Sequence, residues 1–242
     1  MTIRIAMWSG PRNLSTAMMR SFGSRADTVV SDEPFYGCFL KTSGADHPMR
    51  EEVVAAMDCD WRRVMASLSG PSPGGAEIWY QKHMWHHMTG PIGFDDFDGF
   101  IHAFLIREPE QMIASYMRKR ESARFEDFGL ERQAEFFERE ADRLGSAPPV
   151  IDAADVQANP GAILPRLCAA LEISWDEAML RWAPGPRATD GPWAPHWYAA
   201  VEASTHFEAP TFEPAVLPAE ARALADACRP YYDHLARFRI RS

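Results

Sequence analysis

Short apolar segments alternate with helical segments along most of the chain, and this alternation is the strongest constraint on its fold. Apolar runs typical of strands lie at 3–8, 28–31, 77–82, 100–106 and 150–151. Segments with helical spacing or helix-start signals lie at about 13–24, 48–68, 109–117, 130–144 and 160–171. Strands that alternate with helices are joined by crossovers and run parallel. The sequence therefore predicts an α/β fold with three layers and a central, mostly parallel sheet of about five strands.

The length of the chain favours a single domain. The chain has 242 residues, the size of one large α/β domain, so we expect one domain over 1–242 with its core at about 1–180. The remainder, about 181–242, is rich in tryptophan and proline. It should form loops and a last helix that begins near Pro218 and is interrupted at Pro230.

Charge and cysteine usage exclude several kinds of partner. The formal net charge is −9, whereas a nucleic-acid-binding protein usually needs a basic face. The four cysteines are irregularly spaced, as expected for reduced thiols in the cytoplasm. The run 100–106 is too short to span a bilayer, and the first residues lack a signal-peptide pattern. We expect a cytoplasmic protein that binds neither nucleic acid nor membrane; its oligomeric state stays open.

The stretch IAMWSGPRNLSTAMMRSF, residues 5–22, predicts an anion site. It reads as a buried strand, a turn and the start of a helix. The first N–H groups of a helix have no internal partners and carry a partial positive charge. Arg12 adds a cation, and Ser15 and Thr16 add hydroxyl donors. The Gly-Lys-Ser/Thr of a triphosphate loop is absent, so a phosphate group held without a metal fits better than Mg·ATP.

A second anion site is predicted by FLIREPEQMIASYMRKR, residues 104–120. A buried strand ends at Arg107, and Ser115 follows eight residues later, about two turns into the next helix. Ligands of open parallel sheets bind beyond the carboxyl ends of the strands. Two anion sites at strand ends indicate a ligand with phosphates at two places.

Together the two sites resemble those of sulfotransferases that use 3′-phosphoadenosine 5′-phosphosulfate (PAPS), a family with a fold like that of P-loop NTPases. The family loop commonly reads P-K-S-G-T-T, and PRNLST is similar, with Arg12 in place of lysine and Leu14 in place of glycine. An arginine followed eight residues later by serine resembles the family's 3′-phosphate site. The stretch VIDAADVQANPGAILPRLCAALEI, residues 150–173, is similar to a later family segment.

The resemblance covers about residues 3–180, and it implies a metal-free PAPS site. The residues that it assigns to PAPS are Gly10, Pro11, Arg12, Asn13, Leu14, Ser15, Thr16, Arg107 and Ser115. Arg12 would also act in catalysis, by stabilising the charge that develops on the leaving phosphate. A basic loop late in the family's chain folds over the PAPS, and Arg187 in GPRATDGPWAPHWY, residues 185–198, is the candidate for that part.

Two residues compete for the role of general base. His83 follows Lys82 at the predicted end of the third strand, which is similar to the K-x-H segment of one family branch with one residue missing. Glu33 lies in SDEPFYG at the end of the second strand, where other branches place a glutamate. We favour Glu33, because His83 is out of register by one residue.

The histidines of H-x-x-H-H, residues 83–87, would share one face of a helix, and a metal site there is the less favoured interpretation. The function that we predict is transfer of a sulfuryl group from PAPS to a hydroxyl or amine of a small molecule, without a metal. Two alternatives stay open: a P-loop nucleotide hydrolase or kinase, and a non-catalytic nucleotide-binding module that keeps the sulfotransferase fold.

Overall fold

The centre of the protein is a sheet of five parallel strands. The computed structural model describes residues 2–209 and 217–242. Its strands are β1 (Ile3–Ser9), β2 (Thr28–Asp32), β3 (Ile78–Met84), β4 (Ile101–Ile106) and β5 (Val150–Asp152), in the order β2-β3-β1-β4-β5. Every neighbouring pair is parallel. The predicted α/β class and the five-stranded parallel sheet are confirmed.

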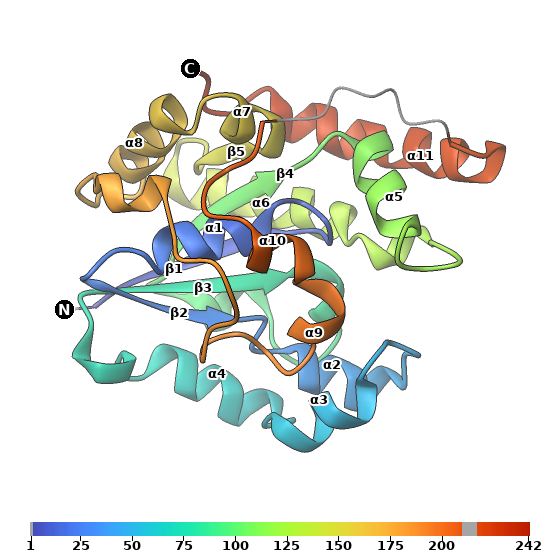
Figure 1. Ribbon diagram of the computed structural model, residues 1–242, viewed down its shortest axis with the longest axis horizontal. Coiled ribbons are helices and arrows are strands. Elements are labelled where there is room, and N and C mark those ends of the chain that lie inside the picture. Colours follow the sequence, from blue (N-terminus) through green and yellow to red (C-terminus); the bar gives the residue numbers. More distant parts are fainter. Residues whose placement is uncertain (1, 210–216) are drawn as a thin grey trace.

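Helices surround this sheet (Figure 1). Before β4 they are α1 (Ser15–Phe22), α2 (Tyr36–Ser43), α3 (Arg50–Ala56) and α4 (Trp61–Ser69). After β4 come α5 (Pro109–Met117), α6 (Leu130–Leu144), α7 (Ala153–Ala158) and α8 (Pro160–Ala170). The last part of the chain forms α9 (Ala194–Trp197), α10 (Ala199–Ala203) and α11 (Ala219–Ala236). None of the helices in 2–209 and 217–242 has the length and apolar character needed to cross a membrane.

The core explains why β1 lies in the middle of the sheet. Ile5, Ala6, Met7 and Trp8 are completely buried, because β3 and β4 flank the strand and helices cover it. Trp8 stacks on His83 and Trp85, and its indole Nε1 donates to Nδ1 of His102 at 3.0 Å. Such burial of continuous apolar strands is typical of parallel sheets.

Three boundaries differ from the sequence-based expectation. The predicted helix over 48–68 is two helices, because the carboxylate of Asp60 accepts from the N–H groups of Arg62 and Arg63 and starts α4 anew. The third strand continues to Met84 instead of ending at Lys82. The predicted interruption at Pro230 is wrong, since α11 runs through it and is held by packing on α5 and α6.

Candidate functional site

The β1–α1 loop is built to present backbone donors. Leu14 caps α1 with φ 68° and makes no side-chain cap hydrogen bond, so no side chain caps the first N–H groups of the helix. Arg12 also has a positive φ, 61°. Residues other than glycine rarely adopt this conformation, and such strain gathers where function requires a particular backbone path. The glycine that the PAPS-dependent family has at the position of Leu14 suits the same path.

Arginines gather beside this loop. The Nη1 of Arg107, at the end of β4, donates to the carbonyl oxygen of Arg12 at 2.6 Å, which fastens the loop to the strand. The Nε of Arg12 donates to the hydroxyl of Ser115 at 3.1 Å. The Nε of Arg107 is buried without a partner among the described residues. Burial and the neighbouring Arg118 lower the pKa of Arg12, and burial and Arg12 lower that of Arg107. Clustered cations of this kind favour an anionic ligand.

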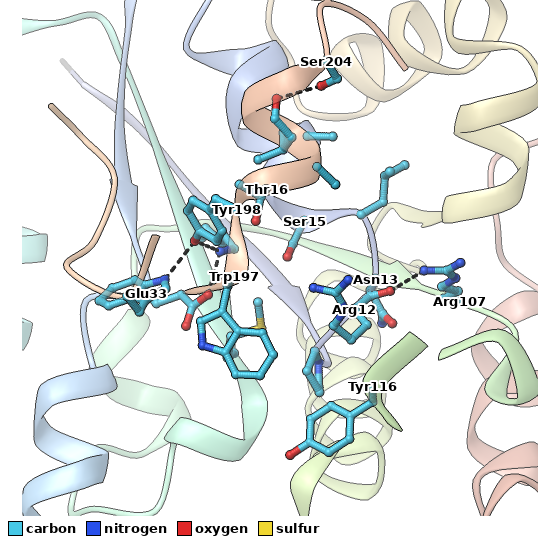
Figure 2. Close-up of a pocket in the computed structure, with 18 of the residues that line it drawn as sticks. Arg12, Asn13, Ser15, Thr16, Glu33, Arg107, Tyr116, Trp197, Tyr198 and Ser204 are labelled. Atoms are coloured by element: carbon cyan, nitrogen blue, oxygen red, sulfur yellow. Dashed lines mark hydrogen bonds and ion pairs between the residues drawn. The ribbon is translucent and has the colours of Figure 1, made fainter. Parts of the chain in front are cut away.

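A cavity of about 260 Å³ opens in front of the loop. Residues 11–17 and Arg107 form one wall, and Glu33 lies on the opposite side, with the ring of Trp197 between them (Figure 2). Ser15 and Thr16 lie at the first turn of α1 and line the cavity. The predicted loop and the predicted base therefore share one cavity.

The structure does not bring every predicted site residue into this cavity. Ser115 lies behind Arg12 and is buried. Gly10 lies outside the lining, and its lack of a side chain lets the carbonyl of Phe128 approach, since a Cβ there would lie 2.9 Å from that oxygen. Arg187 contacts the carbonyl oxygen of Gly23 at 3.4 Å and does not line the cavity.

His83 also lies outside the cavity. It is within β3, and side chains alternate between the faces of a strand, so Lys82 and Met84 line the cavity while His83 points to the other face. There it stacks on Trp8, with Nε2 3.2 Å from Oε1 of Gln81. Burial lowers the pKa of His83 to about 3. Of the two predicted bases, Glu33 is therefore the one that lines the cavity.

Glu33 belongs to a buried network of charges. The Nζ of Lys82 donates to Oε1 of Glu33 at 2.6 Å, to Oδ1 of Asp32 at 2.8 Å and to the hydroxyl of Tyr198 at 2.7 Å. The Tyr198 hydroxyl donates to Oδ2 of Asp32 at 2.7 Å, and Nε1 of Trp193 donates to that hydroxyl. One ammonium thus faces two carboxylates, and the cluster carries a net negative charge.

This environment sets the protonation of Glu33. Burial raises the pKa of Glu33 to about 6; Lys82 lowers it and Asp32 raises it. The same carboxylates raise the pKa of Lys82 well above its ordinary value, so Lys82 stays an ammonium. A carboxylate with a pKa near 6 is ionised at neutral pH and is a better proton acceptor than an ordinary glutamate. Glu33 also has a positive φ, 43°.

Sequence reasoning missed several residues that line the cavity. Lys82 enters the prediction only as part of a motif, and Asp32 is not assigned to the site. The aromatic residues Tyr36, Tyr116 and Tyr198 were not assigned to the site, and neither was Arg120. Tyr198 and Trp197 come from the proline-rich stretch, whose sequence lacks a period that would place its side chains.

A metal centre finds no support in the described part of the chain. Within 2–209 and 217–242 no group of three or more His, Cys, Asp or Glu side chains is placed to hold a metal ion. His86 and His87 lie in a short turn after β3 (Trp85–His87) instead of on one long helix with His83. The Nδ1 of His87 is 3.7 Å from Oε2 of Glu33, too far for a hydrogen bond.

Comparison with known proteins defines the class. The sulfotransferase domain family matches residues 3–238, so this chain belongs to the sulfotransferase family. Among solved structures it is similar to the sulfotransferase from Alicyclobacillus acidocaldarius, with a TM-score of 0.57 and 14% identity over 100% of this chain and 97% of that one. At that identity the likeness concerns the fold.

Two curated relatives have a different kind of name. The branched-chain-amino-acid aminotransferase-like proteins 1 and 2 of Arabidopsis thaliana are 36% and 35% identical over 231 residues. The match covers 96% of this chain but 41% of each relative, so the chain spans about two fifths of their length. Their names describe these longer proteins.

Proposed function

We propose that the chain is a PAPS-dependent sulfotransferase that acts on a hydroxyl or amine of a small molecule. The observation that supports this most is the division of one cavity. Backbone N–H groups, Ser15, Thr16 and arginines line one wall, and the buried carboxylate of Glu33, paired with Lys82, lines the other. The first wall suits a donor with anionic groups, and the second suits an acceptor that must lose a proton.

The residues supply three parts of the chemistry. PAPS provides a sulfuryl group whose sulfur bonds to the acceptor oxygen while its bond to the 5′-phosphate oxygen breaks. Glu33 takes the acceptor proton onto its carboxylate. The α1 N-terminus, with Arg12, stabilises the electron pair that stays on the leaving phosphate. Arg107 and Ser115 hold Arg12 and its loop, and the guanidinium of Arg107, which lines the cavity, binds the 3′-phosphate.

The Lys82 ammonium argues against aminotransferase chemistry in this chain. Such chemistry needs a lysine amine that forms a Schiff base with pyridoxal phosphate. The sequence has three lysines, and Lys82 is the one that lines the cavity. Two carboxylates and Tyr198 hold it in its charged form, which is not nucleophilic.

Ligand-induced thermal stabilisation tests the donor. We expect adenosine 3′,5′-bisphosphate (3′,5′-ADP) to raise the melting temperature more than 5′-AMP or Mg·ATP does, because a ligand stabilises in proportion to ln(1 + [L]/Kd). In Arg107→Gln the preference for 3′,5′-ADP over 5′-AMP should disappear. A larger shift with Mg·ATP, abolished by EDTA, would support a nucleotide hydrolase or kinase instead.

A substitution tests the base. Glu33→Gln should reduce sulfuryl transfer by roughly 10²–10⁴-fold, the usual contribution of a general base. It should still bind 3′,5′-ADP, since Glu33 lies on the wall away from the loop. His83→Gln is the matched comparison, and we expect it to retain activity. Unchanged turnover in Glu33→Gln would remove this residue from the mechanism. A protein that binds 3′,5′-ADP but transfers no sulfuryl group from PAPS to any acceptor would be the non-catalytic module.

A further inference from the structure

The cavity has a second end, away from the β1–α1 loop, and its lining is mainly aromatic. Tyr36 stacks on His87 with ring centroids 4.3 Å apart and an interplanar angle of 7°, and meets the edge of Trp193 at 4.9 Å. Tyr116 and Trp197 lie nearer the loop (Figure 2). Rings packed against one another in this way form flat, rigid walls. They suit a flat apolar body of the acceptor.

The imidazoles at this end carry no charge at neutral pH. His47, His86 and His87 all line the cavity. Burial lowers the pKa of His47 to about 4 and that of His86 to about 3, and lowers that of His87 well below its ordinary range. Lys82 is neutralised by Asp32 and Glu33. These groups therefore offer no positive charge to a ligand.

Arg120 is different, because its charge is not matched by a carboxylate. It lines the cavity and is half-buried, and its Nη1 donates to the backbone carbonyl oxygen of Asp46 at 2.9 Å. Over the described ranges 2–209 and 217–242 no carboxylate oxygen lies within ion-pair distance of it; the carboxylate of Asp127 pairs with Arg124 instead. The hydrogen bond to Asp46, the residue before His47, places Arg120 at the aromatic end of the cavity.

We propose that Arg120 binds an anionic group of the acceptor, and that the acceptor is an aromatic hydroxy acid. Its hydroxyl would face Glu33, its ring would lie between the aromatic side chains, and its carboxylate would accept hydrogen bonds from the guanidinium of Arg120. A guanidinium presents its donors in a planar fork that matches a carboxylate. This inference rests on the proposed function, since it assigns the acceptor of the same cavity.

Binding experiments test the proposal without turnover. Para-hydroxyphenylacetate, its methyl ester and tyramine share a phenol and differ in charge. Isothermal titration calorimetry on the protein, alone and with 3′,5′-ADP, should show the acid binding about tenfold or more tightly than the ester, the range for a hydrogen bond to a charged group. Tyramine should bind most weakly. Arg120→Gln should reduce the ratio between acid and ester to near one.

A matched variant excludes a general effect of charge. Arg124→Gln removes a neighbouring positive charge that is 76% exposed and outside the cavity, and it should keep the preference for the acid. The proposal is overturned if the ester or tyramine binds as tightly as the acid, or if none of the three binds. It is also overturned if Arg120→Gln weakens 3′,5′-ADP while leaving the acid unaffected, because Arg120 would then serve the donor.

The proposed function can fail separately. If the unmodified protein does not bind 3′,5′-ADP, the assignment of PAPS as donor is contradicted. The comparison of acid and ester on the protein alone still decides the role of Arg120.

Discussion

Glu33 and Lys82 show how a few contacts set the behaviour of one side chain. Both are almost fully buried, and a buried carboxylate without a partner would be neutral. Lys82 counters that tendency but is shared with Asp32, so the pKa of Glu33 is raised only to about 6. The arrangement keeps Glu33 ionised near neutral pH and leaves it able to accept a proton.

Removing Lys82 should change the pH dependence of activity. In Lys82→Met the pKa of Glu33 should rise by roughly one to two units, because the nearby positive charge that lowers it is gone. The acid limb of the kcat profile should move to higher pH by that amount. Lys82→Arg keeps the charge and should keep the profile close to that of the unmodified protein. An unmoved limb in Lys82→Met would show that Lys82 does not act on the base.

Leu14 offers a test of backbone strain. Its φ of 68° is costly for residues with a Cβ, by roughly 1–2 kcal/mol. Leu14→Gly relieves that strain but loses side-chain packing and makes the unfolded chain more flexible, so we expect a change within about 1 kcal/mol. Leu14→Val keeps a Cβ and adds branching, and should destabilise by about 1–3 kcal/mol. Urea unfolding followed by circular dichroism measures both. If the two substitutions change the free energy of unfolding equally, the backbone at Leu14 is not strained.

At the scale of elements, the late segment is fastened to the first helix. Arg20 of α1 is buried and makes a bidentate pair with Asp190, at 2.5 and 2.7 Å. The backbone N–H of Arg187 donates to the same carboxylate, and that of Gly191 donates to Asp32. Through these bonds the segment before α9 is held against α1 and the end of β2. The wall that carries Trp197 and Tyr198 depends on them.

Breaking the pair should cost stability. Asp190→Ala leaves the Arg20 guanidinium buried and unpaired, which typically costs about 3–5 kcal/mol. The double variant Arg20→Met with Asp190→Leu removes both charges and should recover most of that loss. Equilibrium unfolding in urea gives the free energies for the cycle. If the double variant is as unstable as Asp190→Ala, the loss comes from packing and not from an uncompensated charge.

The sequence predicted the elements with strong local signals. The buried strands, the β1–α1 loop and Arg107 at the end of β4 follow from apolar runs, a turn and a strand end, and the resemblance to sulfotransferases is confirmed by the family match. The prediction went wrong where one residue decides the outcome. With β3 ending at Lys82, His83 was free to face the site; in a strand that continues to Met84, alternation turns it away.

The residues contributed by the last part of the chain could not be predicted in the same way. Tyr198 reaches Asp32 across 166 residues of sequence. Tyr198 lies between the short helices α9 and α10, whose sequences are too short to show a helical period, so no local pattern indicates where its hydroxyl lies. The contact depends on the tertiary fold, which brings residues 166 positions apart together.

At the scale of the whole molecule, the net charge of the chain and the charge of the cavity wall have opposite signs. The chain has a net charge of −9, yet Arg12, Arg107 and Arg120 line the same cavity. The excess of acidic groups over the molecule repels anions in general, whereas these three arginines make the cavity a local attractive site for them.

Buried histidines should make the protein sensitive to acid. Burial lowers the pKa of His83 to about 3 and of His102 to about 4, from an ordinary value of 6.5. As the pH falls, these histidines become protonated in the unfolded chain before they do so in the folded protein. The free energy of unfolding therefore keeps its full contribution from them above pH 6.5. It decreases as the pH falls toward 4, by up to about 1.4 kcal/mol per pH unit for each histidine. Glu33 has the opposite effect, because its pKa is raised from 4.5 to about 6 in the folded protein. The folded protein takes up this one proton first, which increases the free energy of unfolding between pH 6 and 4.5.

Thermal unfolding from pH 7.5 to 5 measures this dependence. We expect the melting temperature to fall steadily below pH 6.5. The melting temperature of His83→Phe should fall less steeply, because one titrating group is gone while a ring still stacks on Trp8. A melting temperature that is constant or rises on acidification would contradict the burial of neutral imidazoles.

The attachment of the late segment also has a consequence for biosynthesis. A ribosome delivers the strands, the β1–α1 loop and Glu33 well before residues 191–198 emerge. Until then Asp32 and Lys82 lack the hydroxyl of Tyr198 and the N–H of Gly191, and water reaches them freely. The sheet and the β1–α1 loop can thus form while Asp32 and Lys82 are still open to water. Residues 191–198 then cover Asp32 and Lys82 and exclude the water from them.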